Sequence, residues 1–545
     1  MKRRQFLRQS TQVTLASSLL PLAAGALPAA LPTTTPRSPT AQPQDKGLDL
    51  SERTIADLQA YLQSNQGSSR RLCQLYLDRI ESLNAKGPAI NAIIELNPDA
   101  LSIADALDKE RKAGKLRGPL HGIPVLLKDN IDTGDKMQTT AGALALAGHR
   151  AAKDSFVAKQ LRAAGAVILG KTNLSEWANF RSTHSASGWS SRGGQTHNPY
   201  VLDRTPSGSS AGSGAAVAAS LCAVAVGTET NGSIVSPSSV NGLVGLKPTV
   251  GLVSRTGIIP ISATQDTAGP MTRTVRDAAL LLGGLVGADP ADAATQAPTA
   301  PKKPLDYTRL LRPEALRGQK LGVEKGHLAS QTAAGELLRQ AVAVLKAQGA
   351  TVVEVDVRSA VAPVGESEFD VLLYEFKDGV NKYLGQTNAP VKTLADVIAF
   401  NKANAAKAMP FFQQETLELA EKTEGLGAEK YKTALRKVVD TSRQALDAAL
   451  KTDGGLAAIV GITTGPAACI DLVNGEYGTG PGFSGPAAMA GYPHLTVSMG
   501  NVHGLPIGIS FVGGPYKEAE LLSLGYAYEQ ATKHRQAPTF RAVVG

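Results

Sequence analysis

The chain has 545 residues, of which 43% are hydrophobic, only 5% are aromatic and 55 are glycine. This length and composition exclude a disordered or fibrous chain and fit a large, turn-rich globular enzyme. The formal net charge is +9, but the first 40 residues contain no acid and hold Lys2, Arg3, Arg4, Arg8 and Arg37. The charge of the remaining chain therefore gives no indication of nucleic acid or a membrane surface as a partner.

The first 31 residues have the pattern of a bacterial export signal. A basic head that contains Arg3-Arg4 precedes an apolar centre at 15–31 with small residues near its end. This order is typical of a cleaved signal, and the arginine pair resembles a twin-arginine signal. Residues 32–47 are rich in Pro and Thr, which predicts a linker. We expect the export machinery to deliver the protein to the periplasm or the exterior, with no membrane anchor in the mature form.

Apolar strand-like runs alternate with amphipathic helices after residue 48. The helical pattern is clearest at 54–64, 70–84, 99–113 and 155–164. Strands are predicted at 123–127, 167–169, 221–226, 243–246, 321–323, 352–357, 457–462, 495–497 and 507–512. Such alternation predicts an α/β fold with a large mixed, twisted sheet covered by helices on both faces. Residues 365–450 are mostly helical and predict an insertion within one catalytic domain, 48–545.

Two blocks of small residues stand out between the predicted strands. The first is 206–214 (PSGSSAGSG), which precedes an alanine-rich helix predicted at 211–220. The second is 227–233 (GTETNGS), which follows an apolar strand. Glycine allows tight turns and close approach of a ligand, and serine supplies nucleophilic hydroxyl groups. Consecutive N–H groups of the turn at 230–233 could bind one oxyanion.

These blocks resemble the signature of the amidase-signature family, G-G-S-S-G-G-S followed by G-T-D-x-G-G-S and G-L-K-P-T. The stretch 119–130 (PLHGIPVLLKDN) is similar to the strand that carries the family's lysine. The resemblance extends to 486–493 and 504–508 and covers about residues 50–540. It implies the amidase-signature fold and the hydrolysis of carboxamide C–N bonds.

The resemblance also implies a role for individual residues. Ser233 matches the nucleophile, Ser209 the serine that is held by an unusual cis peptide bond, and Lys128 the general base. The N–H groups of Thr230, Asn231, Gly232 and Ser233 match the oxyanion hole, and Ser210 a supporting hydroxyl. Ser207, Ala211 and Asn231 replace glycines of the family pattern. Asparagine would be the least costly substitute if the turn required a positive φ at 231.

Lysine can act as a base only when its amine is neutral. A solvated lysine has a pKa near 10.4, and burial lowers this pKa because water no longer stabilises the ammonium form. Lys128 ends an apolar run, which predicts a buried amine. We expect it to take a proton from Ser209, which takes one from Ser233, without a metal or cofactor. Asp129 would point to the opposite face of the strand.

The substrate is expected to be a small-molecule or peptide amide. The second block and residues 188–200 look closest to bacterial peptide amidases, which remove the C-terminal amide of peptides. A general aryl or aliphatic amidase is the alternative. A role within a tRNA-dependent amidotransferase is disfavoured by the export signal. An esterase with Ser210 as nucleophile, from the G-x-S-x-G pattern at 208–212, is disfavoured because the preceding residues are polar and end in Pro206.

Aromatic residues near the signature have two interpretations. Trp177, Phe180 and Trp189 could line a substrate pocket together with the helical insertion, or they could be core residues. The three cysteines are far apart and indicate neither a disulfide framework nor a metal site.

Overall fold

A computed structural model describes residues 48–64, 66–297 and 305–545. The predicted export signal and linker therefore lie outside the described residues. Residues Leu48–Gly545 form one compact unit. No helix in the described ranges is both long and apolar enough to cross a membrane.

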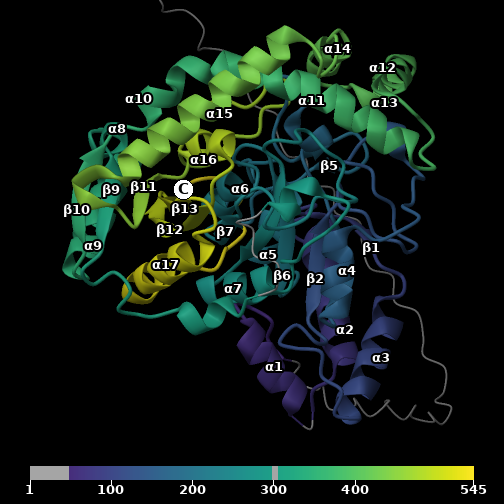
Figure 1. Ribbon diagram of the computed structural model, residues 1–545. Helices are drawn as coiled ribbons and strands as arrows, with labels where there is room; N and C mark the ends of the chain where they lie inside the picture. The colour runs from purple at the N-terminus through teal and green to yellow at the C-terminus, as the bar shows by residue number, and fades with distance from the viewer. Residues whose placement is uncertain (1–47, 65, 298–304) are drawn as a thin grey trace, which may run out of the picture. The chain divides into compact units, whose positions relative to one another are not determined.

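An eleven-stranded mixed sheet forms the centre of the fold (Figure 1), and two further strands pair in a separate hairpin. The strand order is β1-β3-β2-β6-β8-β7-β12-β13-β11-β9-β10. The strands are β1 Ile93–Leu96, β2 Pro124–Lys128, β3 Val167–Thr172, β6 Val224–Glu229, β7 Val244–Lys247, β8 Thr267–Thr272, β9 Lys320–Glu324, β10 Thr351–Val355, β11 Ala458–Ile462, β12 His494–Val502 and β13 Leu505–Val512, with β4 Trp189–Ser190 and β5 Gly194–Gln195 in the hairpin. The α/β fold with a large mixed sheet is confirmed.

Seventeen α-helices surround the sheet within the described ranges. They are α1 Ile55–Gln63, α2 Ser69–Ile80, α3 Ala100–Lys112, α4 Phe156–Ala163, α5 Ala211–Ala218, α6 Val235–Val240, α7 Val275–Gly283, α8 Lys325–Leu328, α9 Ala333–Ala347, α10 Arg358–Val361, α11 Gly365–Gly385, α12 Leu394–Ala403, α13 Ala405–Ala408, α14 Glu415–Glu421, α15 Glu429–Leu450, α16 Ser484–Ala490 and α17 Glu518–Thr532. In Figure 1, β12 and β13 lie between α17 on one side and α15 with α16 on the other.

The central strands are buried on both faces, so their sequences are nearly continuous apolar runs. Every residue of β2, β3 and β6 is buried. β2 is parallel to both of its neighbours, and its Leu127 lies opposite Val226 of β6. Because parallel strands end at the same edge, Lys128 at the end of β2 comes next to the end of β6.

Several element boundaries differ from the sequence prediction. The strand expected at 221–226 begins at Val224 and continues through Glu229, because the preceding residues form the turn that follows α5. The helix expected at 70–84 gives way to a π-helical turn after Ile80. Strands β1 and β8 were not predicted. β1 has only four residues, and β8 (TAGPMT) contains the glycine and proline that usually argue against a strand.

The helical segment 365–450 packs through two apolar clusters. One joins α11, α12 and α14 to Trp177 and Phe180. The other joins α10, α11 and α15 to α16. Trp177 is 1% exposed and packs edge-on against Phe376, with ring centroids 6.0 Å apart. These contacts favour the core interpretation of the aromatic residues that precede the signature.

Candidate active site

The site lies at the edge of the sheet where the parallel strands β2 and β6 end. Lys128 is fully buried. Its Nζ lies 2.8 Å from Ser209 Oγ, 2.9 Å from Thr228 Oγ1 and 3.3 Å from the Thr228 carbonyl oxygen. Burial lowers the pKa of Lys128 to about 7, although Asp266 and Glu229 oppose this shift by stabilising the ammonium form. A substantial fraction of the amine is therefore neutral near neutral pH.

The three neighbours of Lys128 Nζ are all oxygens, so they can accept from an ammonium group and can also be arranged around a neutral amine. Such an amine has two N–H donors and one lone pair. The carbonyl and the hydroxyl oxygen of Thr228 can accept the two N–H groups, which leaves the lone pair for the hydroxyl proton of Ser209. Asn130 Nδ2 donates to the same Thr228 hydroxyl at 3.0 Å. The hydroxyl of Ser209 and the two oxygens of Thr228 are thus arranged around Lys128 Nζ so that Lys128 can accept a proton from Ser209.

The first small-residue block brings Ser209 to the lysine. The Gly208–Ser209 peptide bond is cis, as the family resemblance implies. The Ser209 carbonyl accepts a hydrogen bond from the N–H of Ser175. A side chain at Gly208 would meet Ser175 Oγ at 2.3 Å, so a larger residue there would displace the Ser175 hydroxyl. Ser207, which replaces a family glycine, adopts a left-handed φ of 57°.

Ser210 connects the first block to the second. Its hydroxyl donates to the Thr228 carbonyl at 3.0 Å and accepts from the Thr228 N–H at 3.2 Å. Its own N–H donates to the Ser233 carbonyl at 3.2 Å. Ser210 therefore holds the end of β6 and the turn that carries Ser233 against the start of α5. No histidine bonds to its hydroxyl within the described ranges, which gives the esterase interpretation no support.

The turn at 230–233 is held by one carboxylate. Glu229 accepts hydrogen bonds from the N–H groups of Gly232, Ile234 and Val235, at 2.8, 2.8 and 3.0 Å. The positive φ of the turn falls at Gly232, with a value of 88°, and not at Asn231. Asn231 therefore does not need to tolerate a positive φ, which was the reason given for an asparagine at this position.

The four N–H groups predicted for an oxyanion hole differ in their availability. The N–H of Gly232 is bonded to Glu229. The N–H groups of Thr230, Asn231 and Ser233 make no hydrogen bond within the described part of the chain. Three donors in one turn thus remain available, and their role stays a prediction.

Ser233 is placed next to this arrangement but is not hydrogen-bonded to Ser209. Its side chain is nearly buried, with 8% of the residue exposed. In the described ranges no hydrogen bond joins the two serine hydroxyls. The backbone contact between Ser210 and Ser233 keeps the two segments adjacent. Transfer of a proton between the serines would therefore require Ser233 to turn toward Ser209.

Polar residues that the sequence analysis did not single out complete the site. Asp266, at the start of β8, accepts from Thr230 Oγ1 at 2.5 Å, and burial raises its pKa to about 6. Glu368 of α11 accepts from Asn231 Nδ2 at 2.8 Å and from Gln265 Nε2 at 3.0 Å. Asn130 and Thr228 stood inside the motifs already recognised, whereas Asp266, Gln265 and Glu368 lie in segments without a motif.

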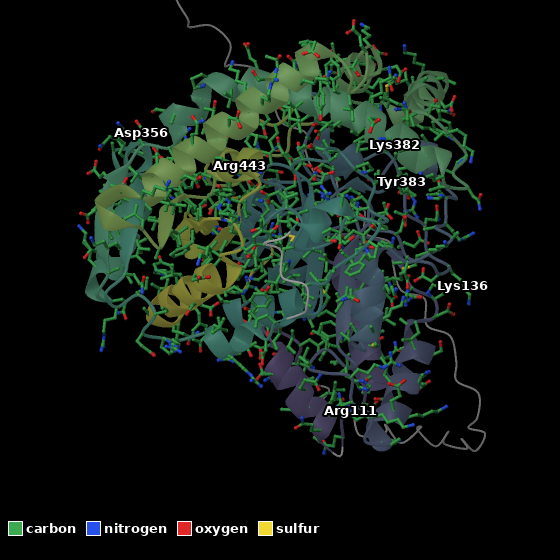
Figure 2. All side chains as sticks on the ribbon, viewed as in Figure 1. Arg111, Lys136, Asp356, Lys382, Tyr383 and Arg443 are labelled. Atoms are coloured by element: carbon green, nitrogen blue, oxygen red, sulfur yellow. The ribbon has the colours of Figure 1, made fainter. Side chains whose placement is uncertain are left out.

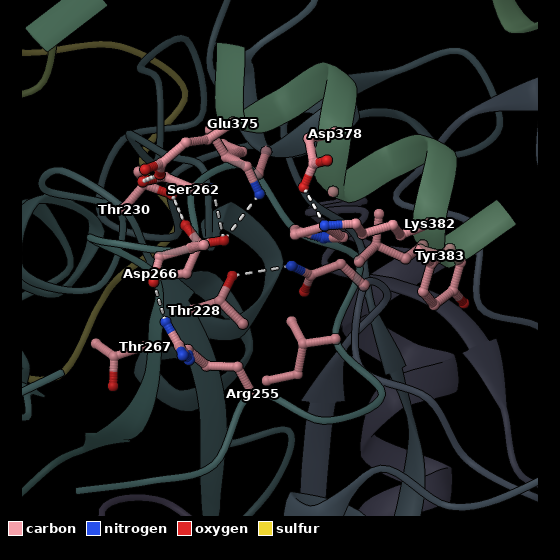
Figure 3. A pocket seen from close by; sticks show the side chains of 18 of the residues that line it. Thr228, Thr230, Arg255, Ser262, Asp266, Thr267, Glu375, Asp378, Lys382 and Tyr383 are labelled. Carbon is pink, nitrogen blue, oxygen red and sulfur yellow. Dashed lines mark hydrogen bonds and ion pairs between the residues drawn. The ribbon is translucent and has the colours of Figure 1, made fainter. Parts of the chain in front are cut away.

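A cavity of about 360 Å³ adjoins the site on the side of Thr228 and Thr230 (Figure 3). Its opposite wall is formed by α11, which supplies Glu375, Asp378, Lys382 and Tyr383. This volume lies within the range of small-molecule binding sites. The helical insertion therefore covers a pocket that reaches the partners of Lys128.

A buried lysine bonded to a serine lies here beside a turn with free N–H groups, which is the arrangement that the resemblance to amide hydrolases implied. The amidase family matches residues 71–522 of this chain. A probable amidase of Arabidopsis thaliana is 42% identical over 91% of this chain and 93% of its own length. The chain belongs to the amidase family and is an amide hydrolase.

Two further similarities bear on the substrate. The crystal structure of native peptide amidase from Stenotrophomonas maltophilia is 49% identical, has a TM-score of 0.85 and matches 90% of this chain and 99% of that one. A component of the glutamyl-tRNA(Gln) amidotransferase of Halorhodospira halophila is 35% identical over 90% of this chain and 99% of its own length.

Proposed function

We propose that this amidase removes the C-terminal carboxamide of peptides and releases ammonia. The observation that carries the choice of substrate is the 49% identity to a peptide amidase over nearly the whole of both chains. A general aryl or aliphatic amidase remains the alternative.

The proposed chemistry follows from the contacts around Lys128. The neutral amine accepts the proton of Ser209, and Ser209 accepts the proton of Ser233. The Ser233 oxygen forms a bond with the carboxamide carbon, and the N–H groups of Thr230, Asn231 and Ser233 stabilise the oxyanion. The proton returns through Ser209 to the nitrogen, the C–N bond breaks and ammonia leaves. Water then hydrolyses the acyl ester of Ser233 by the same route.

Ammonia release from a panel of amides tests the substrate. The panel contains N-acetylated peptide amides, benzamide, acetamide, a fatty amide and glutamine, with Ser233→Ala as the inactive control. We expect the enzyme to prefer the peptide amides and to leave their backbone peptide bonds uncleaved. Turnover of benzamide or acetamide without turnover of peptide amides would refute the peptide proposal, and release from glutamine alone would favour an amidotransferase-like role.

The acyl-enzyme is tested separately with hydroxylamine. If Ser233 carries the acyl group, hydroxylamine competes with water and part of the product is a hydroxamate. Direct attack of water on the amide would instead leave the product entirely as the acid. Ser210→Ala serves as the matched control, since its hydroxyl bonds only to the Thr228 backbone and its loss should not abolish trapping.

We further propose that residues 1–31 direct export through a twin-arginine pathway into the periplasm or beyond. The pattern of Arg3-Arg4 followed by an apolar centre supports this proposal. Replacing both arginines by lysine should leave the full-length protein in the cytoplasm, as judged by fractionation. Export that is unchanged by this double substitution would contradict it.

A further inference from the structure

The cavity beside Thr228 combines apolar walls with an excess of carboxylates. Ile258, Ile259, Ile261 and Leu426 supply apolar surface. Four acidic and two basic side chains line it, which gives a formal charge of −2: Asp266, Asp292, Glu375 and Asp378 against Arg255 and Lys382. Figure 3 labels all of these charged groups except Asp292 around the cavity. A confined pocket with this excess attracts cations.

One polar atom in the cavity wall has no partner. Asn130 is 2% exposed and lines the cavity. Its Nδ2 donates to Thr228, but its Oδ1 is buried without a hydrogen bond within the described residues. A buried acceptor without a partner is costly, so this atom favours a ligand that carries hydrogen-bond donors. This observation is independent of the charge of the cavity.

The position of the cavity indicates which part of a substrate it holds. Thr228 contacts Lys128 Nζ, and Thr230 begins the turn that ends at Ser233. Ammonia, the leaving group of a primary carboxamide, is far smaller than about 360 Å³. A group that fills the cavity must therefore belong to the acyl part of the substrate.

We infer that this cavity is a specificity pocket for an acyl group with an aliphatic stem and a cationic end, such as the side chain of an arginine or lysine amide. The apolar walls contact the stem, as they do for buried lysine and arginine stems in proteins. The net negative charge of the lining attracts the cationic end, and Asn130 Oδ1 is an acceptor in the lining that has no partner within the described residues. The inference deepens the proposed function but requires only that Ser233 cleaves carboxamides.

Two residues at the edge of the cavity, Asp378 and Lys382, allow a test that leaves Lys128 and its hydrogen-bond partners unchanged. Asp378 and Lys382 form an ion pair of 2.7 Å on α11, with side-chain exposures of 31% and 67%. Lys382 lies at the surface beside Tyr383 (Figure 2). Asp378→Asn makes the cavity less negative by one charge, and Lys382→Gln makes it more negative by one charge. Their effects on a cationic substrate should therefore have opposite signs.

The experiment compares N-acetyl-arginine amide with N-acetyl-citrulline amide, which has nearly the same shape without the charge. Wild type should prefer arginine in kcat/KM by about fivefold or more. Asp378→Asn should lower this ratio about threefold, and Lys382→Gln should raise it about threefold. The control is Asp370→Asn on the same helix. Asp370 forms a 2.7 Å pair with Lys430 at 30% and 63% exposure and does not line the cavity, so the ratio should not change.

The same comparison with 5-guanidinopentanamide and 5-ureidopentanamide separates this inference from the peptide proposal. These small amides carry the charged and neutral ends without a peptide bond. If only the small amides are cleaved, the peptide proposal fails while the charge preference is still measured. The specificity pocket would be overturned if the charged and the neutral amide of a pair had equal kcat/KM, or if neither charged amide were turned over. It would also be overturned if Asp370→Asn and Asp378→Asn changed the ratio of charged to neutral kcat/KM equally.

Discussion

At the scale of single residues, the central feature is a lysine whose amine is partly neutral at neutral pH. Lys128 is fully buried, and it makes no ion pair within the described ranges. Its three hydrogen-bond partners are neutral oxygens of Ser209 and Thr228. Burial without a paired carboxylate is what lowers the pKa of an amine into the physiological range.

The pH dependence of kcat/KM should report this pKa. Lys128 acts in its neutral form, so activity should fall about tenfold per pH unit below about 7 and reach a plateau above it. The measurement is kcat/KM of the wild type from pH 5.5 to 9.5 on a neutral amide. A profile without an inflection near 7, or one that still rises toward pH 10, would mean that the base is a different or a solvated group.

Thr228 should act as a positioning residue for Lys128. Thr228→Val removes one acceptor from Lys128 Nζ and leaves Asn130 Nδ2 without its partner. We expect kcat/KM to fall by about 10- to 100-fold. Acceptors stabilise the ammonium form, so their loss should also move the inflection of the pH profile below 7.

Thr228→Ser is the matched control, because it keeps the hydroxyl and should restore most of the activity and the inflection near 7. A purely structural role of Thr228 would lower the activity without moving the inflection. Equal activities of the valine and serine variants would show that the hydroxyl has no part in orienting the lysine.

The family resemblance predicted Lys128, Ser209, Ser210 and Ser233, and the structure brings the segments that carry them together. Sequence reasoning could not find Asp266 or Glu368, because neither stands in a motif and both reach the turn only through the folding of distant segments. It also could not foresee that Gly232 donates its N–H to Glu229.

At the scale of elements, the turn at 230–233 depends on Glu229. Its two carboxylate oxygens accept three N–H groups, which fixes the backbone that carries Ser233. Hydrogen bonds to a buried carboxylate are stronger than those between neutral groups. The same residue ends β6, so strand and turn are positioned together.

Glu229→Gln should destabilise this turn. The amide nitrogen of glutamine would face N–H donors in place of one carboxylate oxygen, so we expect a loss of about 1–3 kcal/mol in the free energy of unfolding, measured by denaturant titration. The activity should fall as well, because the oxyanion donors lie in the same turn.

Glu368→Gln provides the comparison for this prediction. Glutamine at 368 can still accept from Asn231 Nδ2 through its carbonyl oxygen, so its effect on stability should be smaller. If the two variants lose the same stability, the three bonds to Glu229 do not hold the turn in the way described.

Elements were predicted with uneven success, for physical reasons. Fully buried strands such as β2 and β11 are mostly apolar runs and were placed to within one residue. β8 was missed because Gly269 and Pro270 break the usual pattern, yet it pairs with β6 and β7 within the sheet. Strand pairing with neighbours can stabilise a sequence that its own composition disfavours.

At the scale of the whole molecule, the sheet and the insertion have separate tasks. The parallel ends of β2 and β6 bring Lys128 to Thr228, and α5 and its preceding loop add Ser209. The helical insertion supplies α11, which forms the outer wall of the cavity. In the proposed mechanism the reaction uses groups placed by the sheet, whereas the proposed choice of acyl group depends on the insertion. Sequence alone predicted the first, but the charged lining of the cavity comes from segments distant in sequence and required the fold.

The most direct test of the account is kcat/KM of Lys128→Met. Methionine fills a similar space without a base, so the fold should be retained, as checked by circular dichroism and thermal unfolding. Because the proposed mechanism begins with proton transfer to this amine, we expect kcat/KM to fall by about 1,000-fold or more. A folded Lys128→Met protein that retains a tenth or more of wild-type activity would contradict the central claim.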